Sequence, residues 1–393
     1  SANFALYGDI SDRMMSLAER LGHRQEIYSI DECFLDLTGI ADASQRARQT
    51  RAQILQWLDI PSCVGIGPTL TLAKLANHIA KSAERKPGSY PARLAQVCNL
   101  NELDERQRHW LYRRTAVTEV WGVGPRIGRQ LQAAGVHSVL DLLRLDTASA
   151  RAIGSVLLER TVRELNGIAC LSLEDAPAPK QQIACTRSFG QRATKWSELN
   201  EAVSEFASRA ARKLRVQSSH AGAVLVFIRT SPFRIRERQY ACSATVALRR
   251  PGSDTGSIIG AALAGLEQIF RPGYDYAKAG VMLLDLQPAA LEQLELALEP
   301  NGSNDETVDK PPGSASRDPS RRARLMQALD QLNSRYGAGT LQLASAGLAK
   351  SAKTVGMAGP AAIGAESRGW QMRQERRSPR YTTHWDELQV VNA

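Results

Sequence analysis

The sequence predicts a multidomain α+β protein, because three different patterns of strands and helices follow one another along its 393 residues. Residues 1–90 alternate helices with short strands, which predicts a partial sheet backed by helices. Residues 91–173 contain helical patterns only. Residues 183–290 have the order β-α-β-β-α-β, which predicts a four-stranded sheet with two helices. A chain of this length allows two to four domains.

The composition narrows the class of function. A net charge of +10 and a pI of about 9.5 favour a polyanionic partner, nucleic acid before a membrane surface. The six cysteines are scattered without a Cys-x-x-Cys pair, which indicates reduced thiols rather than disulfides or a zinc site. No apolar run approaches the roughly 20 residues of a membrane span. We therefore expect a cytoplasmic protein without a membrane partner.

Two adjacent acids occupy the turn of a predicted hairpin in the first pattern. The strands are Ile27–Ile30 and Cys33–Leu37, which are rich in β-branched and aromatic residues, and Asp31 and Glu32 form a two-residue tip between them. The side chains of neighbouring residues within a strand point to opposite faces of the sheet. At the tip of a hairpin, by contrast, two neighbouring carboxylates can converge on one cation such as Mg²⁺. These residues alone leave open a Mg²⁺ site or a solvated acidic turn.

Three helices and one buried strand complete the first pattern. They are predicted at Ser11–Leu21, Asp42–Leu58, Ser62–Gly67 (the strand) and Thr69–Ser82, with Ser11 and Asp42 as candidate N-caps. On the last helix Lys74 and Lys81 lie two turns apart on one face. A lysine there either is solvated or meets a triphosphate near the acidic hairpin.

A Gly-x-Gly turn begins a helix–hairpin–helix pattern in the second region. Gly122 and Gly124 precede a basic helix that carries Arg126, and this helix ends at Ala134-Gly135-Val136 before a further helix at Ser138–Leu145. The glycines allow the backbone to approach an anion, and helix N-terminal amides can bind phosphate. The pattern predicts recognition of a DNA backbone; the alternative is a plain helical hairpin.

Residues 174–182 are predicted to form a linker, and the third pattern of strands and helices follows this linker. The predicted strands are Ile183–Phe189, Ala223–Thr230, Tyr240–Leu248 and Ala279–Leu286, and the helices are Ser197–Val216 and Thr255–Phe270.

Basic residues are concentrated in this third pattern. Residues 183–250 hold thirteen basic and only four acidic side chains, nearly the whole excess of the chain. The basic set is Arg187, Arg192, Lys195, Arg209, Arg212, Lys213, Arg215, Arg229, Arg234, Arg236, Arg238, Arg249 and Arg250. A solvated basic face is one explanation, and contact with a phosphate backbone is the better one for so local an excess.

The C-terminal part is polar. Residues 291–320 contain Gln293-Leu294-Glu295-Leu296-Ala297 and then a Gly-, Ser-, Asp- and Pro-rich stretch, 300–320, that is predicted to be disordered. The tail, residues 321–393, has one predicted helix at Arg322–Asn333 and is otherwise expected to be largely disordered, including the Gly/Ala-rich passage 344–364.

Several of these stretches resemble motifs of the Y-family of translesion DNA polymerases. The run Tyr28–Gly39, the segment Gly65–Asn77 with Lys81, and Val120–Gly124 are similar to its two palm motifs and its thumb. Within the family the chain resembles the UmuC, MucB, ImpB and RulB branch. The stretches specific to that branch are Arg163–Gly167, Arg187–Gly190, Lys278–Met282 and Ser378–Thr383.

The resemblance implies an error-prone polymerase that copies past DNA damage in the SOS response and DNA repair. It assigns a partial palm to residues 1–90, a thumb to 91–173, a little finger to 183–290 and a UmuC-type tail to 321–393. It further implies two Mg²⁺ ions, with Asp31 and Glu32 as catalytic metal ligands and Lys81 on the incoming triphosphate. DNA contacts are expected from Gly122, Gly124, Arg126, Arg187, Arg229 and Arg236.

The resemblance also implies partners. These are primer–template DNA and dNTP, a UmuD′-like subunit, a RecA filament and the sliding clamp, in the bacterial cytoplasm or on the nucleoid. Gln293, Leu294 and Leu296 resemble the clamp-binding peptide of the family, but Ala297 replaces its aromatic residue, which predicts weakened binding. The alternative for this segment is a plain helix end.

One departure from the family pattern matters. The family carries another catalytic Asp in an Asp-x-Asn-x-Phe-Tyr motif, followed by a fingers domain, whereas residues Ser1–Tyr7 resemble the sequence just after the fingers. We therefore expect a two-metal site that is short of one carboxylate, with severely impaired activity in this chain. The alternative hypothesis is a catalytically incomplete fragment that acts as a damaged-DNA-binding and partner-binding module.

Overall fold

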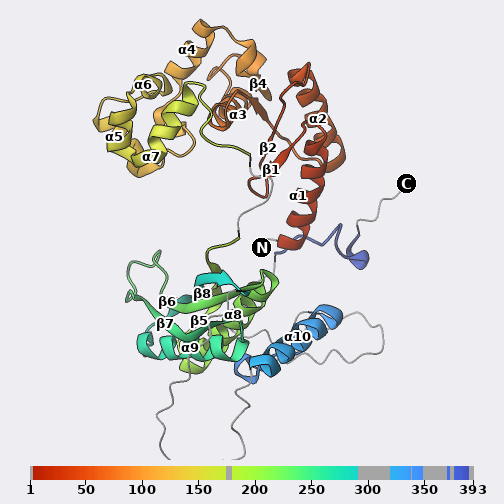
Figure 1. Ribbon diagram of the computed structural model, residues 1–393, viewed down its shortest axis with the longest axis vertical. Coiled ribbons are helices and arrows are strands. Elements are labelled where there is room, and N and C mark those ends of the chain that lie inside the picture. The colour runs from red at the N-terminus through yellow and green to blue at the C-terminus, as the bar shows by residue number, and fades with distance from the viewer. Residues whose placement is uncertain are drawn as a thin grey trace, which may run out of the picture. The chain divides into compact units, whose positions relative to one another are not determined.

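The computed structural model describes residues 3–173, 179–290, 319–337, 339–347, 370–371 and 376–388 (Figure 1). The chain forms two compact units. The first unit comprises residues 2–177 with 377–393, and the second unit comprises residues 178–376. No helix in the described part of the chain combines the length and the apolar character needed to cross a membrane.

The first unit begins with α1 (Phe4–Glu19), which starts earlier than the sequence predicts. Its N-cap is Asn3, whose side-chain oxygen accepts a hydrogen bond from Leu6 N at 3.4 Å. The predicted N-cap Ser11 is wrong: it is buried inside the helix and donates to the carbonyl of Ile30 at 2.5 Å. A serine inside a helix is tolerated because its hydroxyl is satisfied by another segment rather than by helix amides.

Two small sheets lie in the first unit. β1 (Gln25–Ile27) and β2 (Cys33–Leu35) pair antiparallel, and β3 (Val64–Ile66) pairs parallel with β4 (Val97–Asn99). The strands are shorter than predicted, and β4 is a strand that the sequence analysis missed. A three-residue strand has too few alternating positions to be read from a sequence.

Two helices flank the short strands. They are α2 (Ala43–Leu58) and α3 (Leu70–Arg85). Asp42 precedes α2 as predicted, but it has φ 53° and makes no side-chain cap hydrogen bond. Gly65 explains why β3 and α3 lie so close, because a Cβ at this position would fall 2.1 Å from the backbone nitrogen of Asn77.

The remainder of the first unit is mainly helical, as the sequence predicts. Its helices are η1 (Ala92–Leu94), η2 (Leu100–Glu102), α4 (Glu105–Arg114), η3 (Val117–Glu119), α5 (Pro125–Ala133), α6 (Val139–Arg144) and α7 (Thr147–Leu165), with a break in α7 at Gly154 and Ser155. Leucines of α4, α5 and α6 are fully buried in a core that continues onto α3. This shared core fixes these helices to α3.

The second unit has the element order that the sequence predicts. The elements are β5 (Ile183–Ala193), α8 (Trp196–Val216), β6 (Ser219–Arg229), β7 (Ala241–Gly252), α9 (Thr255–Ile269) and β8 (Tyr276–Pro288). The strands form one antiparallel sheet in the order β5-β8-β6-β7. α8 and α9 pack against each other and on the same face of the sheet (Figure 1).

The two faces of this sheet differ because successive side chains alternate. Val224, Val226 and Ile228 of β6 and Ala279 and Val281 of β8 are fully buried against the helices. The opposite set of residues defines what we call the open face. Its members include Thr186 and Ser188 of β5, Lys278 and Met282 of β8, Leu225, Phe227 and Arg229 of β6, and Ser243 and Thr245 of β7.

The described C-terminal residues divide between the two units. α10 (Pro319–Tyr336) contains the predicted helix, and its Asp330 accepts two hydrogen bonds from Arg215 of α8, at 2.6 and 2.9 Å. η4 (Ala344–Ala346) packs on α8, and Trp370 lies in the core of the second unit, 5.7 Å from the ring of Phe206. The predicted disordered stretch, 300–320, lies almost wholly outside the described residues.

The last described residues belong to the first unit. η5 (Trp385–Glu387) follows Arg380, whose guanidinium is paired with Glu387. The side-chain amide of Asn3 donates to the carbonyls of Ser378 and Pro379, at 3.0 and 3.3 Å. This part of the tail, expected to be disordered, is therefore held at the start of α1.

Candidate functional site

Asp31 and Glu32 lie in the turn between β1 and β2. The turn is longer than the two-residue tip that was predicted, because Tyr28 N and Ser29 N both donate to the carbonyl of Glu32 at 3.0 Å. Asp31 is exposed, and its carboxylate accepts a hydrogen bond from the hydroxyl of Ser29 at 2.7 Å. The turn thus presents two carboxylates from a backbone that is tied by its own hydrogen bonds.

Lys74 of α3 reaches the acidic turn. Its Nζ lies 2.6 Å from Glu32 Oε2, and only 16% of the lysine side chain is exposed. The same Nζ lies 4.5, 5.5 and 5.8 Å from the ring centres of Tyr28, Phe34 and Trp121. Aromatic faces stabilise a cation that has lost water. The three rings therefore hold the ammonium group in place, and the ammonium group orients the Glu32 carboxylate.

Lys74 was predicted to share a face with Lys81 and to be either solvated or near a triphosphate, but its pairing with Glu32 was not predicted. The contact joins residues 42 positions apart, and the ring of Trp121 comes from a third segment. No spacing in the sequence indicates this cluster.

A cleft of about 580 Å³ opens beside the turn. Asp31, Glu32 and Lys74 line it, together with Asn77 of α3 and the residues of β3. The side-chain oxygen of Asn77 is buried without a hydrogen-bond partner among the described residues. The cleft thus combines two carboxylates and an ammonium group, a set that suits a charged, phosphate-bearing ligand with its cation.

Asp31 and Glu32 are the kind of ligand that Mg²⁺ prefers. Two Mg²⁺ ions, however, need more carboxylates than these two. Mg²⁺ is commonly bound through one or two carboxylates, with water and phosphate oxygens completing its shell. Asp31 and Glu32 meet that requirement for one ion. Within the described ranges no group of three or more His, Cys, Asp or Glu side chains is close enough to hold a metal.

Lys81 lies two turns beyond Lys74 on α3. It is exposed, and no contact among the described residues joins it to the acidic turn. Seven helical residues correspond to about 10 Å along the axis. His78 lies between the two lysines on α3. Burial lowers the pKa of His78, the charge of Glu119 raises it, and the charges of Lys86 and Lys81 lower it. His78 therefore adds no positive charge near neutral pH.

The predicted glycine turn and the glycine-ended helix that follows it are both present. Gly122 has φ 89°, Gly124 is the N-cap of α5, and Pro125 is its first residue. Gly135 has φ 83°, and Val136 N donates to Leu131 O at 2.9 Å, which is the hydrogen bond of a glycine-ended helix. Arg126 is exposed in the first turn of α5. The exposed turn and its arginine are brought together as expected.

The arginines of the second unit that were predicted to contact DNA do not lie on one common surface. Arg229 is exposed on the open face and lies in register with Lys278, which the sequence analysis did not select. Arg236 is exposed in the loop after β6. Arg187 pairs in register with the buried Ala279 and therefore lies on the face that α8 and α9 cover. The alternation of β8 would have identified Lys278.

The predicted clamp-binding residues Gln293, Leu294 and Leu296 lie outside the described residues.

Comparison with known proteins agrees with this architecture. The model of the impB/mucB/samB family matches residues 1–78, that of its C-terminal domain matches residues 180–296, and that of a domain of unknown function, DUF4113, matches residues 323–391. UmuC of Salmonella typhimurium is 40% identical over 99% of this chain and 82% of its own length. MucB of Escherichia coli is 38% identical over 100% of this chain and 83% of its own length.

A solved structure shares the fold. A Y-family DNA polymerase chimera of Dbh and Dpo4 matches with a TM-score of 0.51 and 16% identity, covering 72% of this chain and 76% of that one. The fold is therefore that of the Y-family DNA polymerases. Within that class, the identities to UmuC and MucB over the whole chain show that it belongs to the impB/mucB/samB family.

Proposed function

We propose that this chain is an error-prone DNA polymerase subunit that transfers nucleotides to a primer opposite damaged template DNA. The observation that carries the proposal is the acidic turn, in which Glu32 is oriented by Lys74 beside an open cleft. A solvated turn has no need of a lysine held under three aromatic rings. In a chain of this family, the metal-site hypothesis for the turn is therefore preferred to the solvated turn that the sequence left open.

In this proposal Asp31 and Glu32 hold Mg²⁺. When bound, Mg²⁺ activates the primer hydroxyl and offsets the charge that develops on the triphosphate. Glu32 is oriented by Lys74 before substrate arrives, so that little rearrangement is needed at the moment of reaction. Lys81 acts as a point charge on the triphosphate.

We also propose how DNA is held. The exposed first turn of α5 binds a phosphate through Gly124, Arg126 and its backbone amides. The open face of the second unit binds the duplex backbone through Arg229 and Lys278. Both contacts are independent of base sequence, as a polymerase that copies damaged templates requires.

The partners follow from the resemblance to UmuC. We propose a UmuD′-like subunit, a RecA filament and the sliding clamp, the last through the peptide at residues 293–297, for a protein of the bacterial cytoplasm and nucleoid in the SOS response. The missing aromatic residue at Ala297 predicts a weaker clamp contact than the family peptide makes.

A charge-reversal variant tests the DNA-binding part of this proposal. We expect Arg229→Glu with Lys278→Glu to weaken binding of a labelled primer–template duplex, measured by fluorescence anisotropy between about 50 and 200 mM salt. Loss of two phosphate contacts should lower the slope of log K against log salt by about 1.8.

The matched control is Arg321→Glu with Arg324→Glu, the same charge change at exposed positions of α10. It should leave the slope unchanged. Equal slopes for the open-face variant and the wild type would contradict the proposed DNA-binding surface.

A further inference from the structure

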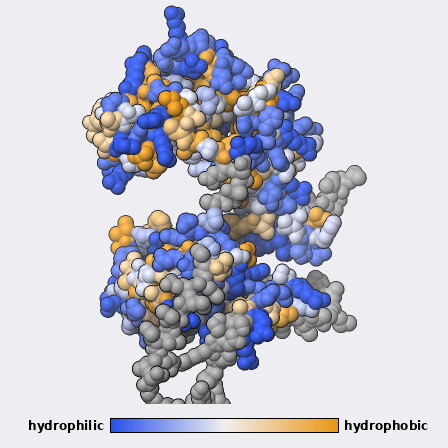
Figure 2. All heavy atoms as spheres, in the orientation of Figure 1, coloured by the Kyte–Doolittle hydropathy of each residue, from blue (hydrophilic) through white to orange (hydrophobic). Residues whose placement is uncertain are grey.

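The loop between β6 and β7 exposes two large apolar side chains. Phe233 is 91% exposed and Ile235 is 89% exposed, more than any other large apolar residue that the structure describes. Figure 2 shows hydrophobic residues at the position of this loop on the surface of the second unit. Exposed apolar groups at a defined place indicate a contact with another molecule.

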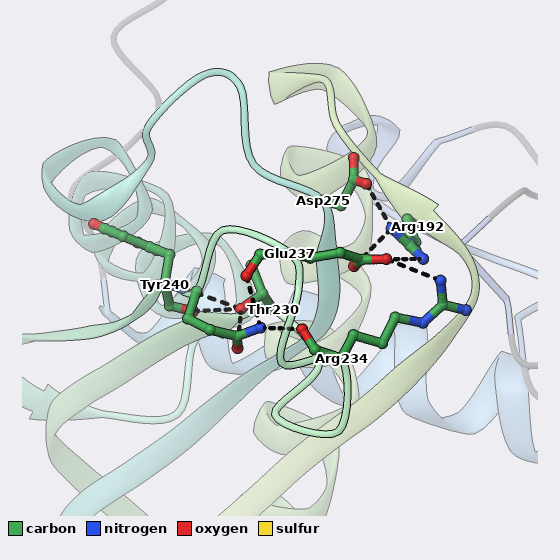
Figure 3. Close-up of polar contacts among 7 residues, drawn as sticks. Arg192, Thr230, Arg234, Glu237, Tyr240 and Asp275 are labelled. Atoms are coloured by element: carbon green, nitrogen blue, oxygen red, sulfur yellow. Dashed lines mark hydrogen bonds and ion pairs between the residues drawn. The ribbon is translucent and has the colours of Figure 1, made fainter.

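The ends of the loop are joined by hydrogen bonds (Figure 3). Thr230 N donates to Tyr240 O at 2.9 Å, and Tyr240 N donates to the Thr230 hydroxyl oxygen at 3.0 Å. The side chain of Gln239 crosses the loop and donates to the carbonyl of Arg234 at 2.8 Å. The loop is therefore closed at its base and braced at its middle.

Ion pairs fix the loop to the sheet. Arg192 of β5 lies 2.9 Å from Glu237 and 2.6 Å from Asp275, and Arg234 lies 3.0 Å from Glu237 (Figure 3). Arg238 lies over the ring of Tyr274 at 4.9 Å. The loop thus presents its apolar residues from a fixed frame, which reduces the entropy lost when they bind a partner.

The charges around the loop favour an anionic partner. Arg234 and Arg236 alternate with Phe233 and Ile235, and the acid Glu237 already has two arginine partners. Arg229, one of the two basic residues of the open face, is the residue before the loop base. An aromatic ring beside guanidinium groups, continuous with a basic sheet face, matches a nucleobase next to its phosphate.

We propose that the tip of this loop binds the face of a nucleobase, with Phe233 stacked on the base and Arg236 on the adjoining phosphate. Two sources present a base face: an unpaired template base, or a base step that opens in the duplex. This inference rests on the proposed DNA binding by the second unit. It adds a site for the base to a surface that otherwise contacts only the backbone.

The test uses 2-aminopurine, which fluoresces when it leaves its neighbours in the stack. The base is placed either in the single-stranded template or within the duplex of a primer–template, and each DNA is titrated with the full chain. We expect fluorescence to rise in one of the two DNAs with the wild type. Phe233→Ala should abolish the rise and weaken affinity about tenfold, whereas Phe233→Tyr should retain both.

The matched control is Val216→Ala, which removes an exposed apolar side chain, 81% accessible, at the end of α8. It should leave fluorescence and affinity unchanged. A rise in the single-stranded arm identifies an unpaired base as the ligand, and a rise in the duplex arm identifies an opened base step.

Unchanged fluorescence and affinity in Phe233→Ala would overturn the inference, and would indicate that the tip contacts a protein instead. If the Arg229→Glu, Lys278→Glu variant still loses duplex binding, the proposed function stands while the base site fails. A wild type that binds neither DNA would overturn both.

Discussion

The pairing of Glu32 with Lys74 changes how the acidic turn is understood at the scale of single residues. The sequence predicts Asp31 and Glu32 as a pair because they are adjacent between two strands. It does not predict Lys74 as their partner, because the 2.6 Å contact depends on how α3 packs against the turn. An ammonium group and a metal ion compete for the same carboxylate, so under the proposed function Lys74 both orients Glu32 and opposes the binding of Mg²⁺ to it.

Replacing Lys74 should separate these two effects. We expect Lys74→Met to lower the Mg²⁺ concentration that gives half-maximal primer extension, because Glu32 no longer has a competing cation. The maximal rate should fall about tenfold, equivalent to about 1.4 kcal/mol, because the carboxylate is no longer oriented. A magnesium titration of the extension rate measures both quantities.

The control for that titration is Lys86→Met, at the exposed C-cap of α3. It should change neither quantity. If Lys74→Met also changes neither, the lysine has no part in positioning Glu32.

At the scale of elements, length and alternation decide what a sequence reveals. The strands of the second unit have 11 to 13 residues, and the order of its strands and helices along the chain was predicted correctly. The strands of the first unit have three residues each, and β4 was missed. Pairing with a distant segment, rather than local pattern, specifies such short strands.

Gly65 offers a test of how closely β3 and α3 must pack. We expect Gly65→Ala to lower the free energy of unfolding by about 1–3 kcal/mol, because the added Cβ would fall 2.1 Å from the backbone nitrogen of Asn77. Thermal unfolding followed by circular dichroism measures the shift.

Gly8→Ala provides the comparison for this change. Gly8 lies inside α1 with no atom within 4 Å of the position of a new Cβ, so alanine there should stabilise the helix by about 0.5–1 kcal/mol. A Gly65→Ala protein that melts at or above the wild-type temperature would show that the strand is free to move away from the helix.

At the scale of the whole molecule, the count of basic residues predicts a polyanionic partner but not the surface that meets it. Arg229 lies on the open face, whereas Arg209, Arg212, Lys213 and Arg215 lie on α8, which packs on the opposite face. Arg215 is used to hold α10 through Asp330. A charge sum contains no information on which face carries each side chain, and so this division could not be predicted.

The described C-terminal residues illustrate the same limit. Outside the predicted helix their composition predicts disorder, yet Trp370 is packed into the core of the second unit, and Ser378 and Pro379 accept hydrogen bonds from Asn3. A few well-placed side chains can fix a segment whose average composition is polar. The part of the chain that matches a domain of unknown function thus contributes residues to both units.

Primer extension by this chain with Mg²⁺ and all four nucleotides tests the central claim most directly, with Asp31→Asn as the variant and Asp12→Asn, an exposed acid of α1, as the control. Because the site is short of one carboxylate for two ions, we predict that the wild type and the control extend a primer past a template lesion only slowly, and that Asp31→Asn lowers this rate at least a hundredfold, equivalent to about 2.7 kcal/mol. Equal extension by Asp31→Asn would contradict the assignment of the acidic turn as the metal site. No extension by the wild type would favour the DNA-binding and partner-binding module instead.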